Sequence, residues 1–264
     1  MKLVPLMIAL LGSAVVPFAV AADAAPVAGL TAADLAAKLS AQQQDGSTLI
    51  RAKLDVKTAA GEAKTVLQLQ IKSRRTPGQT DVVYQVLWPK ERKGESVLVR
   101  SSGSGAVYVP PDKTTSLEAS SLKDALFASD LSYEDVTENF FAWKDQTLVG
   151  TEVVDGANCQ ILESKPKGAR SSYAKVRSWI DTKRMIPLRV EKYSAANQLV
   201  RRVDTTDVAN VDGRYLPANL AVRRPGQDTV TVVDGSRIKR GVSYTDADFT
   251  AEGIKNLSAP RGGD

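Results

Sequence analysis

The chain has 264 residues and carries 35 lysines and arginines against 30 aspartates and glutamates, a formal net charge of +5. The basic residues are spread along the chain rather than gathered in a block, which disfavours nucleic-acid binding and leaves a weak attraction to anionic membrane surfaces. Histidine is absent, which excludes a Ser-His-Asp triad, a Cys-His dyad and any histidine-ligated metal site.

Residues 1–22 predict a signal peptide. Lys2 precedes an apolar run over residues 3–16, and small residues follow at Ala19, Ala21 and Ala22. The apolar run is shorter than the roughly 20 residues that span a bilayer as a helix. Cleavage after residue 21 or 22 would leave residues 23–264 as a single exported domain in the periplasm. No cysteine stands at the cleavage site, so no lipid anchor is expected.

A short amphipathic helix is predicted next, from Thr31 to about residue 44. Thr31 can cap its first turn, and Asp34 at the third position favours the positive end of the helix dipole. Leu35 and Leu39 form a narrow apolar stripe, and Gly46 ends the helix. This stripe is too small to form a core alone, so the helix should pack on a larger element.

That element is predicted to be a long antiparallel sheet. Apolar and polar residues alternate through residues 65–72 and again through residues 82–88, which places one apolar face on each strand. Further strand signals, separated by turn residues, occupy residues 96–100, 106–109, 146–153, 158–164, 173–181, 186–193, 199–206, 214–223 and 229–238. About eleven strands with short connections predict a mainly β (α+β) chain, folded as a curved and partly closed antiparallel barrel.

One substantial insert, residues 117–143, interrupts the strands. Short helices are predicted at residues 120–127 and 132–136, and an aromatic cluster follows them. Together with the first helix, these helices would cover the open side of the barrel. The candidate lid residues in the insert are Phe127, Tyr133, Phe140, Phe141 and Trp143.

Residues 125–136 of this insert resemble a family signature, F-x-S-D-x-S-Y-E-D, of outer-membrane lipoprotein-sorting proteins in the LolA/LolB-like superfamily. Residues 173–193 resemble the central hairpin of that family, residues 212–217 and 229–231 its last strands, and residues 248–250 its closing segment. The chain looks most similar to a branch associated with RND-type lipid exporters. The resemblance covers nearly the whole of residues 23–264.

The resemblance implies an eleven-stranded, half-open barrel, lidded by helices, around an apolar cavity. Residues that could line the cavity are Leu67, Leu69, Ile71, Val82, Tyr84, Val86 and Trp88, although any sheet buries one face by the same alternation. The best-known carriers latch the lid through an arginine in a turn before a proline. Arg75 is the candidate latch here and Arg74 the second, with Thr76 inserted before the proline. The Ser-Tyr-Glu-Asp segment, residues 132–135, is expected to dock the lid.

The resemblance favours a periplasmic carrier that moves a lipid or an acylated lipoprotein between envelope membranes. Its partners would be that cargo, an RND-type inner-membrane exporter and, transiently, a membrane surface, and it would act as a monomer. No cofactor, metal or catalytic residue is expected, and the single Cys159 is expected to be buried and inert. The alternatives are a lipid-sensing adaptor or periplasmic accessory of an exporter, an outer-membrane barrel, which the 6% aromatic content disfavours, and an enzyme.

Overall fold

The structure is a computed structural model, and it describes residues 30–43, 46–76, 78–167, 171–211 and 213–259. The predicted signal peptide, residues 1–22, lies outside the described residues. Where the chain is described, no helix is both long and apolar enough to cross a membrane.

The predicted first helix forms as α1, Ala32–Gln43. The Asp34 backbone N–H donates to Thr31 Oγ1 at 3.1 Å, and the Thr31 N–H and hydroxyl donate to the Asp34 carboxylate in return. This reciprocal capping fixes where the helix starts. Leu35 and Leu39 are buried, so the apolar stripe packs as predicted.

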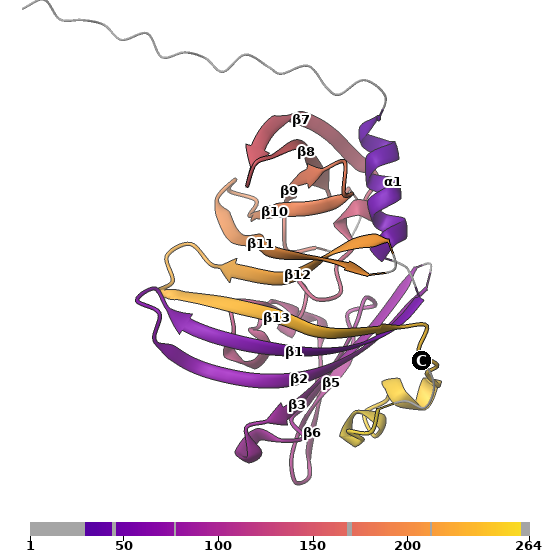
Figure 1. The fold of residues 1–264 in the computed structure, drawn as a ribbon. Helices are drawn as coiled ribbons and strands as arrows, with labels where there is room; N and C mark the ends of the chain where they lie inside the picture. Colours follow the sequence, from indigo (N-terminus) through magenta and orange to yellow (C-terminus); the bar gives the residue numbers. More distant parts are fainter. Residues whose placement is uncertain (1–29, 44–45, 77, 168–170, 212, 260–264) are drawn as a thin grey trace, which may run out of the picture.

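The rest of the described chain is dominated by one antiparallel sheet, drawn in Figure 1. Its thirteen strands in the described residues are β1 (Gly46–Thr58), β2 (Ala63–Thr76), β3 (Gln79–Trp88), β4 (Ser96–Arg100), β5 (Gly105–Val109), β6 (Lys113–Leu117), β7 (Asp145–Val154), β8 (Ala157–Lys165), β9 (Lys175–Asp181), β10 (Ile186–Tyr193), β11 (Leu199–Val211), β12 (Arg214–Arg223) and β13 (Thr229–Arg240). Nearly every strand neighbours the next one in the chain, but β1 pairs with β13. The first and last strands therefore meet in the middle of the sheet.

The predicted count of eleven strands is wrong, because β1 and β6 were not included. In β1 the alternation is present: Ile50, Ala52, Leu54 and Val56 face one side and are separated by charged residues. In β6 only Leu117 is buried, so this edge strand carries no apolar alternation to detect.

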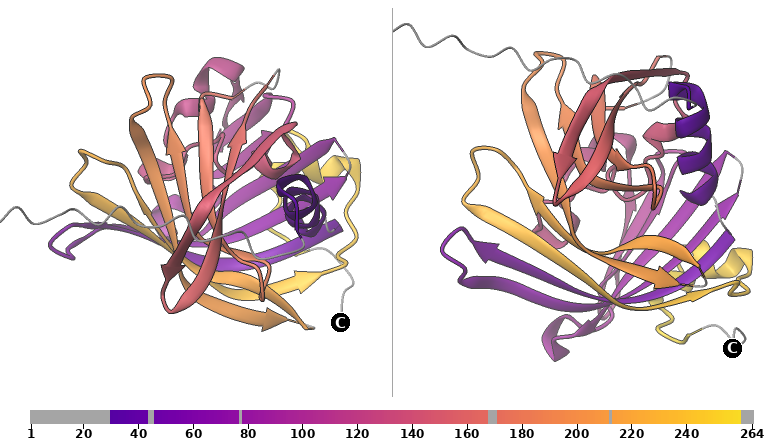
Figure 2. Two further views of the ribbon diagram at one scale, coloured as in Figure 1. Left: turned by 90° about the horizontal axis from the view of Figure 1, so that it is seen from above. Right: turned by 45° about the horizontal axis from the view of Figure 1, so that its top comes forward.

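The sheet is strongly curved but does not close, because β6 and β7 are its two edges and do not pair with each other. Figure 2 shows the strands wrapping around a concave face. The prediction of several covering helices is not confirmed. The insert contains only short 3-10 turns, η2 (Ala119–Lys123), η3 (Leu126–Ala128) and η4 (Phe140–Ala142), and α1 is the one α-helix in the described residues. Two non-glycine residues of η3, Phe127 and Ala128, have positive φ, which an α-helix would not allow.

The insert packs on the concave face. Leu126 and Phe127 are buried against Leu67, Leu69 and Val86 of β2 and β3. On the other side of the concavity, α1 and η4 form a second core with strands β8–β10. Cys159 is buried in a third cluster, and burial raises the pKa of its thiol to about 11, as expected for an inert cysteine.

The convex face of β2–β4 is covered by the C-terminal segment, which carries η5 (Asp246–Phe249) and η6 (Gly253–Lys255). Gln85 Nε2 donates to the carbonyls of Ile254 and Asn256, at 2.8 and 2.9 Å, and Lys72 Nζ donates to Asn256 at 3.0 Å. Phe249 and Ile254 are fully buried beside these contacts. This part of the sheet is therefore buried on both faces.

Candidate functional site: a pocket at the mouth of the concave face

A pocket of ≈ 390 Å³ lies on the concave face, between α1, the insert and the ends of several strands. Its apolar lining residues are Leu39, Ile50, Val136, Phe140, Phe141, Met185, Ile186, Pro187, Leu216, Pro217 and Ile238, with Tyr215 at its side. Its polar lining residues are Gln42, Gln43, Thr48, Ser73, Arg75, Asp135, Glu138 and Arg240. A volume of this size, with mostly apolar walls and a few polar groups, is typical of small-molecule sites.

The pocket lies where two neighbouring strands diverge. β12 and β13 pair only between Asn219–Arg223 and Val230–Asp234. Beyond Asn219, residues 214–217 pair with β11 alone, and residues 235–240 pair with β1 alone. Leu216 and Pro217 line the pocket from one side of this gap, and Ile238 and Arg240 line it from the other.

Aromatic side chains of the insert form the wall of the pocket next to α1. The rings of Phe140 and Phe141 have centroids 4.4 Å apart, and Trp143 packs edge-on to Phe140 at 6.3 Å. All three belong to the core that contains Leu35 and Leu39 of α1. Of the five predicted lid residues, Phe140 and Phe141 thus line the pocket, while Phe127 and Tyr133 pack on β2 and β3 instead.

The predicted cavity residues lie on the same concave face but deeper in the molecule. Leu67, Leu69, Ile71, Tyr84 and Val86 pack in the core beneath the insert, and Val82 is also buried. Trp88 differs from the others, since a bulge places it opposite Gln68 and it is 49% exposed. None of these seven residues lines the pocket, and five of them are covered by the insert.

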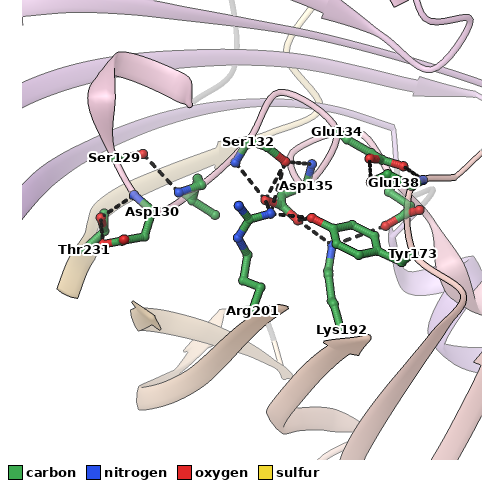
Figure 3. Close-up of polar contacts among 12 residues, drawn as sticks. Ser129, Asp130, Ser132, Glu134, Asp135, Glu138, Tyr173, Lys192, Arg201 and Thr231 are labelled. Carbon is green, nitrogen blue, oxygen red and sulfur yellow. Dashed lines mark hydrogen bonds and ion pairs between the residues drawn. The ribbon is translucent and has the colours of Figure 1, made fainter. Parts of the chain in front are cut away.

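The insert is attached to strands β9–β11 by a buried network of charges around Asp135, shown in Figure 3. Lys192 Nζ donates to Asp135 Oδ1 at 2.7 Å, and Tyr173 OH donates to the same oxygen at 2.8 Å. The guanidinium of Arg201 pairs with the other carboxylate oxygen, which also accepts from the N–H and hydroxyl of Ser132 at 2.7 Å each. The Ser-Tyr-Glu-Asp segment therefore docks the insert onto the sheet.

Three more acidic residues of the insert complete its attachment. Glu134 accepts hydrogen bonds from the backbone N–H and the hydroxyl of Ser172. Glu138 accepts from Ser171 Oγ at 2.5 Å and from Lys192 Nζ at 3.2 Å. Asp130 accepts from the hydroxyls of Thr229 and Thr231 on β13, at 2.8 Å each. The insert is thus bonded to both halves of the curved sheet.

Burial and pairing act in opposite directions on this network. Burial alone would raise the pKa of Asp135, but Lys192 and Arg201 hold that pKa below its ordinary value. Burial likewise disfavours the charged form of Lys192, yet Asp135 and Glu138 raise the Lys192 pKa. The pKa of Glu138 is raised, because burial outweighs its bond to Lys192. Asp135 and Lys192 are consequently a stable ion pair at neutral pH.

Lys192 and Arg201 were not among the predicted site residues, although the sequence carries a signal for Lys192. Ile186, Leu188 and Val190 are buried at alternate positions of β10, and Lys192 continues the same phase. A lysine on an inward-facing position implies a buried carboxylate partner.

The two candidate latch residues point to opposite faces of β2. Arg74 lies on the convex face, where it bonds Asp81 at 3.0 Å and Asp246 at 2.6 Å. Arg75 lies on the concave face and lines the pocket. Arg75 lines the pocket together with Val136 and Glu138 of the insert but forms no hydrogen bond or ion pair with the described residues of the insert, so its role as a latch stays a prediction.

A second cavity of ≈ 790 Å³ lies on the other side of the insert, between the β4–β5 hairpin and residues 171–172. Most of its lining residues are polar or charged, among them Arg100, Lys123 and Glu134. Glu138 lines both cavities, so the segment around Glu138 separates them.

Solved structures with the same fold identify the architecture. A DUF1329 family protein from Desulfovibrio piger is 24% identical, with a TM-score of 0.76, and the match covers 83% of this chain and 95% of that one. A domain named for outer membrane lipoprotein sorting, from Vibrio parahaemolyticus, is 18% identical with a TM-score of 0.75, over 85% and 98% of the two chains. A LolA superfamily protein from Nitrosomonas europaea is 20% identical with a TM-score of 0.69, over 84% and 98%.

At the sequence level, a family model described as "Uncharacterized protein" matches residues 78–256, which is more than half of the chain. The chain belongs to this family. It has the LolA-like fold, as the resemblance in residues 125–136 predicts. No curated protein sequence matches the chain. The association with RND-type exporters stays a prediction.

Proposed function

We propose that this LolA-like protein is a periplasmic carrier, which binds a lipid or an acylated lipoprotein in the pocket and moves it between envelope membranes. The observation that carries the proposal is the apolar pocket at the gap between β12 and β13. The LolA-like fold supports it, since one relative of that fold is named for lipoprotein sorting.

The energetics of lipid transfer require such a pocket. Each methylene taken from an apolar environment into water costs about 0.8 kcal/mol, so a long acyl chain costs on the order of 10 kcal/mol to expose. A carrier offsets this cost with apolar walls, which here come from α1, η4, β1, β12 and β13.

A carrier must also release its cargo, and the wall that contains α1 and η4 is the part we propose to move. It consists of one helix and three aromatic residues that pack together. None of these residues forms the ion pairs that hold residues 130–138, and Lys192 meets the wall only over the Phe140 ring, 5.6 Å from its centroid. Displacing this wall would open the pocket without breaking the network around Asp135. Cargo exchange with a membrane or an exporter would follow.

The test is native mass spectrometry of the protein purified gently from periplasm, combined with lipid extraction. A stoichiometric lipid or acyl-peptide is expected. The variant Ile50→Trp fills the pocket and should lose the bound lipid, while Val153→Trp, on the exposed edge strand β7, should keep it. Equal circular dichroism and Tm of the two variants would show that both fold.

A different outcome rejects the proposal. If the protein stays free of ligand after incubation with inner-membrane lipids and with an acylated lipoprotein, it is not a carrier. A protein-binding adaptor built on the same fold would then be the better explanation.

A further inference from the structure

One side of the pocket is polar, in contrast to its aromatic wall. On the β1–β2 and β1–β13 ladders, Thr48 stands opposite Ser73 on one side and Arg240 on the other, and all three line the pocket. The Thr48 and Ser73 hydroxyls are 2.6 Å apart. The pocket is therefore amphipathic: it has a hydroxyl and guanidinium edge facing an apolar wall.

Arg75 extends this polar edge and is distinctive among the inward-facing cations. Lys192 and Arg201 are each paired with Asp135, whereas no described carboxylate forms an ion pair with Arg75. Burial lowers the pKa of the Arg75 guanidinium, which is the direction expected for a desolvated and unpaired cation. A partly buried charge without a partner is unfavourable, and a bound anion would relieve that cost.

The backbone leaves room for such an anion. Gly46 stands opposite Arg75 on the β1–β2 ladder, and a Cβ added at Gly46 would meet no atom within 4 Å. Gly46 and Arg75 line the same pocket, so the backbone of β1 opposite Arg75 leaves open space there. An arginine fork matches a carboxylate or a phosphate in two parallel hydrogen bonds, which gives it a preference for oxyanions over neutral head groups.

We propose that the pocket selects an amphiphile with a single acyl chain and an anionic head group, with Arg75 pairing with the anion. The chain lies against Phe140, Phe141 and Leu216, and the head group lies at the polar edge. The ≈ 390 Å³ of the pocket is near the lower end of ligand-site volumes, which favours one chain over several. This inference rests on the proposed function and specifies its ligand.

The test compares three ligands with the same oleoyl chain: oleate, 1-oleoyl lysophosphatidic acid and monooleoylglycerol. Affinities are measured by isothermal titration calorimetry, below the critical micelle concentration of each ligand. The wild-type protein should bind the anions at least about 10-fold more tightly than the neutral lipid. Arg75→Gln should remove that preference and leave the affinity for monooleoylglycerol unchanged. Arg75→Lys should keep part of it.

Arg74→Gln is the matched control, because it removes the same charge one residue away on the convex face. It should bind all three ligands as the wild type does. If only oleate or only lysophosphatidic acid shows the preference, the inference holds and the head group is identified as a carboxylate or a phosphate.

Two results would count against the inference in different ways. Equal affinity for charged and neutral ligands in the wild type would overturn the anion preference and leave the carrier proposal intact. Failure of all three ligands to bind would reject the carrier proposal itself. If Arg75→Gln does not fold, the preference is tested instead with Arg75→Lys and with the salt dependence of oleate binding, which must weaken as salt rises.

Discussion

Asp135 is the residue on which the attachment of the insert depends most directly. Its carboxylate accepts hydrogen bonds from Ser132 within the insert, from Tyr173 just before β9, and from Lys192 and Arg201 on β10 and β11. The side chains of Asp135 and Lys192 are both only 4% exposed. An ion pair this deeply buried contributes little to net stability, but removing one partner leaves the other charged and unpaired.

We expect Asp135→Asn to lower the free energy of unfolding by about 3–5 kcal/mol, because Arg201 would lose its buried counter-ion and Lys192 would keep only Glu138. Urea denaturation followed by circular dichroism measures this change. Asp228→Asn is the control, since Asp228 is exposed in the β12–β13 turn. This substitution should leave the free energy of unfolding unchanged. A loss below about 1 kcal/mol in Asp135→Asn would mean that the network does not hold the insert.

The ion pairs of Asp135 should also make the free energy of unfolding depend on pH. The Asp135 pKa is lower in the folded protein than its unfolded value of 3.8. The ionised carboxylate therefore stabilises the folded state fully above pH 3.8, and this stabilisation is lost as the pH falls through the lower folded pKa. The free energy of unfolding should therefore decrease below about pH 4. Measured in the same pH range, Asp135→Asn should show a shallower decrease than the wild type. Parallel curves would assign the acid lability to other carboxylates.

Cys159 provides a separate test of burial. Because its side chain is 1% exposed and burial raises its pKa to about 11, the thiol is protonated and inaccessible at neutral pH. We expect no reaction with Ellman's reagent in the native protein and one equivalent after unfolding in guanidinium chloride. Rapid native labelling would show that the cluster around Cys159 opens frequently.

At the scale of elements, the C-terminal segment makes contacts that are unusual for the convex side of a curved sheet. Gln70, Lys72 and Gln85 are buried on that side and donate to backbone carbonyls of residues 254–257. Two strands that would otherwise face water are covered in this way. The C-terminal segment thus covers the convex face of the sheet, while the insert packs on the concave face.

Gln85→Leu should detach this segment locally. The substitution keeps the volume but leaves the Ile254 carbonyl without its side-chain donor and the Asn256 carbonyl with Lys72 Nζ alone, a cost of about 1–3 kcal/mol. Hydrogen exchange of residues 250–257 should speed up relative to the wild type. The control is Gln68→Leu, because Gln68 is exposed on the neighbouring strand β2. This substitution should leave the hydrogen exchange of residues 250–257 unaltered. Unchanged exchange in Gln85→Leu would mean that apolar packing of Phe249 and Ile254 suffices.

Much of the sheet is predictable from local sequence, and particular residues show why the rest is not. Apolar alternation in residues 65–72 identifies β2 because one face of it is buried in the core. The same rule fails for β6, an exposed edge, and cannot foresee that Gln70 is buried beneath a segment that includes Leu257, 187 positions later. The pocket is not predictable either, since its walls come from seven elements that meet only in the folded molecule.

At the scale of the whole molecule, the pairing of β1 with β13 joins the two ends of the described chain. This ladder runs from Thr48 opposite Arg240 to Thr58 opposite Thr229, and it joins strands β1–β6 and strands β7–β13 into one continuous sheet. The insert connects distant strands as well, since Asp130 accepts a hydrogen bond from Thr231 on β13 and Asp135 forms an ion pair with Lys192 on β10.

We expect equilibrium unfolding in urea to be one cooperative transition. Far-UV circular dichroism and tryptophan fluorescence should give coincident curves, because Trp88 lies on β3 and Trp179 on β9, in the two halves of the sheet. Val153→Ala, at the exposed edge, should leave the curves coincident. Separate midpoints for the two probes would show that β7–β12 unfold independently of β1–β6.

Under the proposed carrier function, the gap between β12 and β13 also determines how cargo would enter. A closed ring of strands is loaded through its end, so the whole ligand must be narrow enough to thread it. Strands that separate along one side instead form a seam, through which an acyl chain slides in sideways while its attached group stays outside. The width of that group then places no limit on loading. A protein as large as the carrier could be held by its acyl chain as readily as a free lipid.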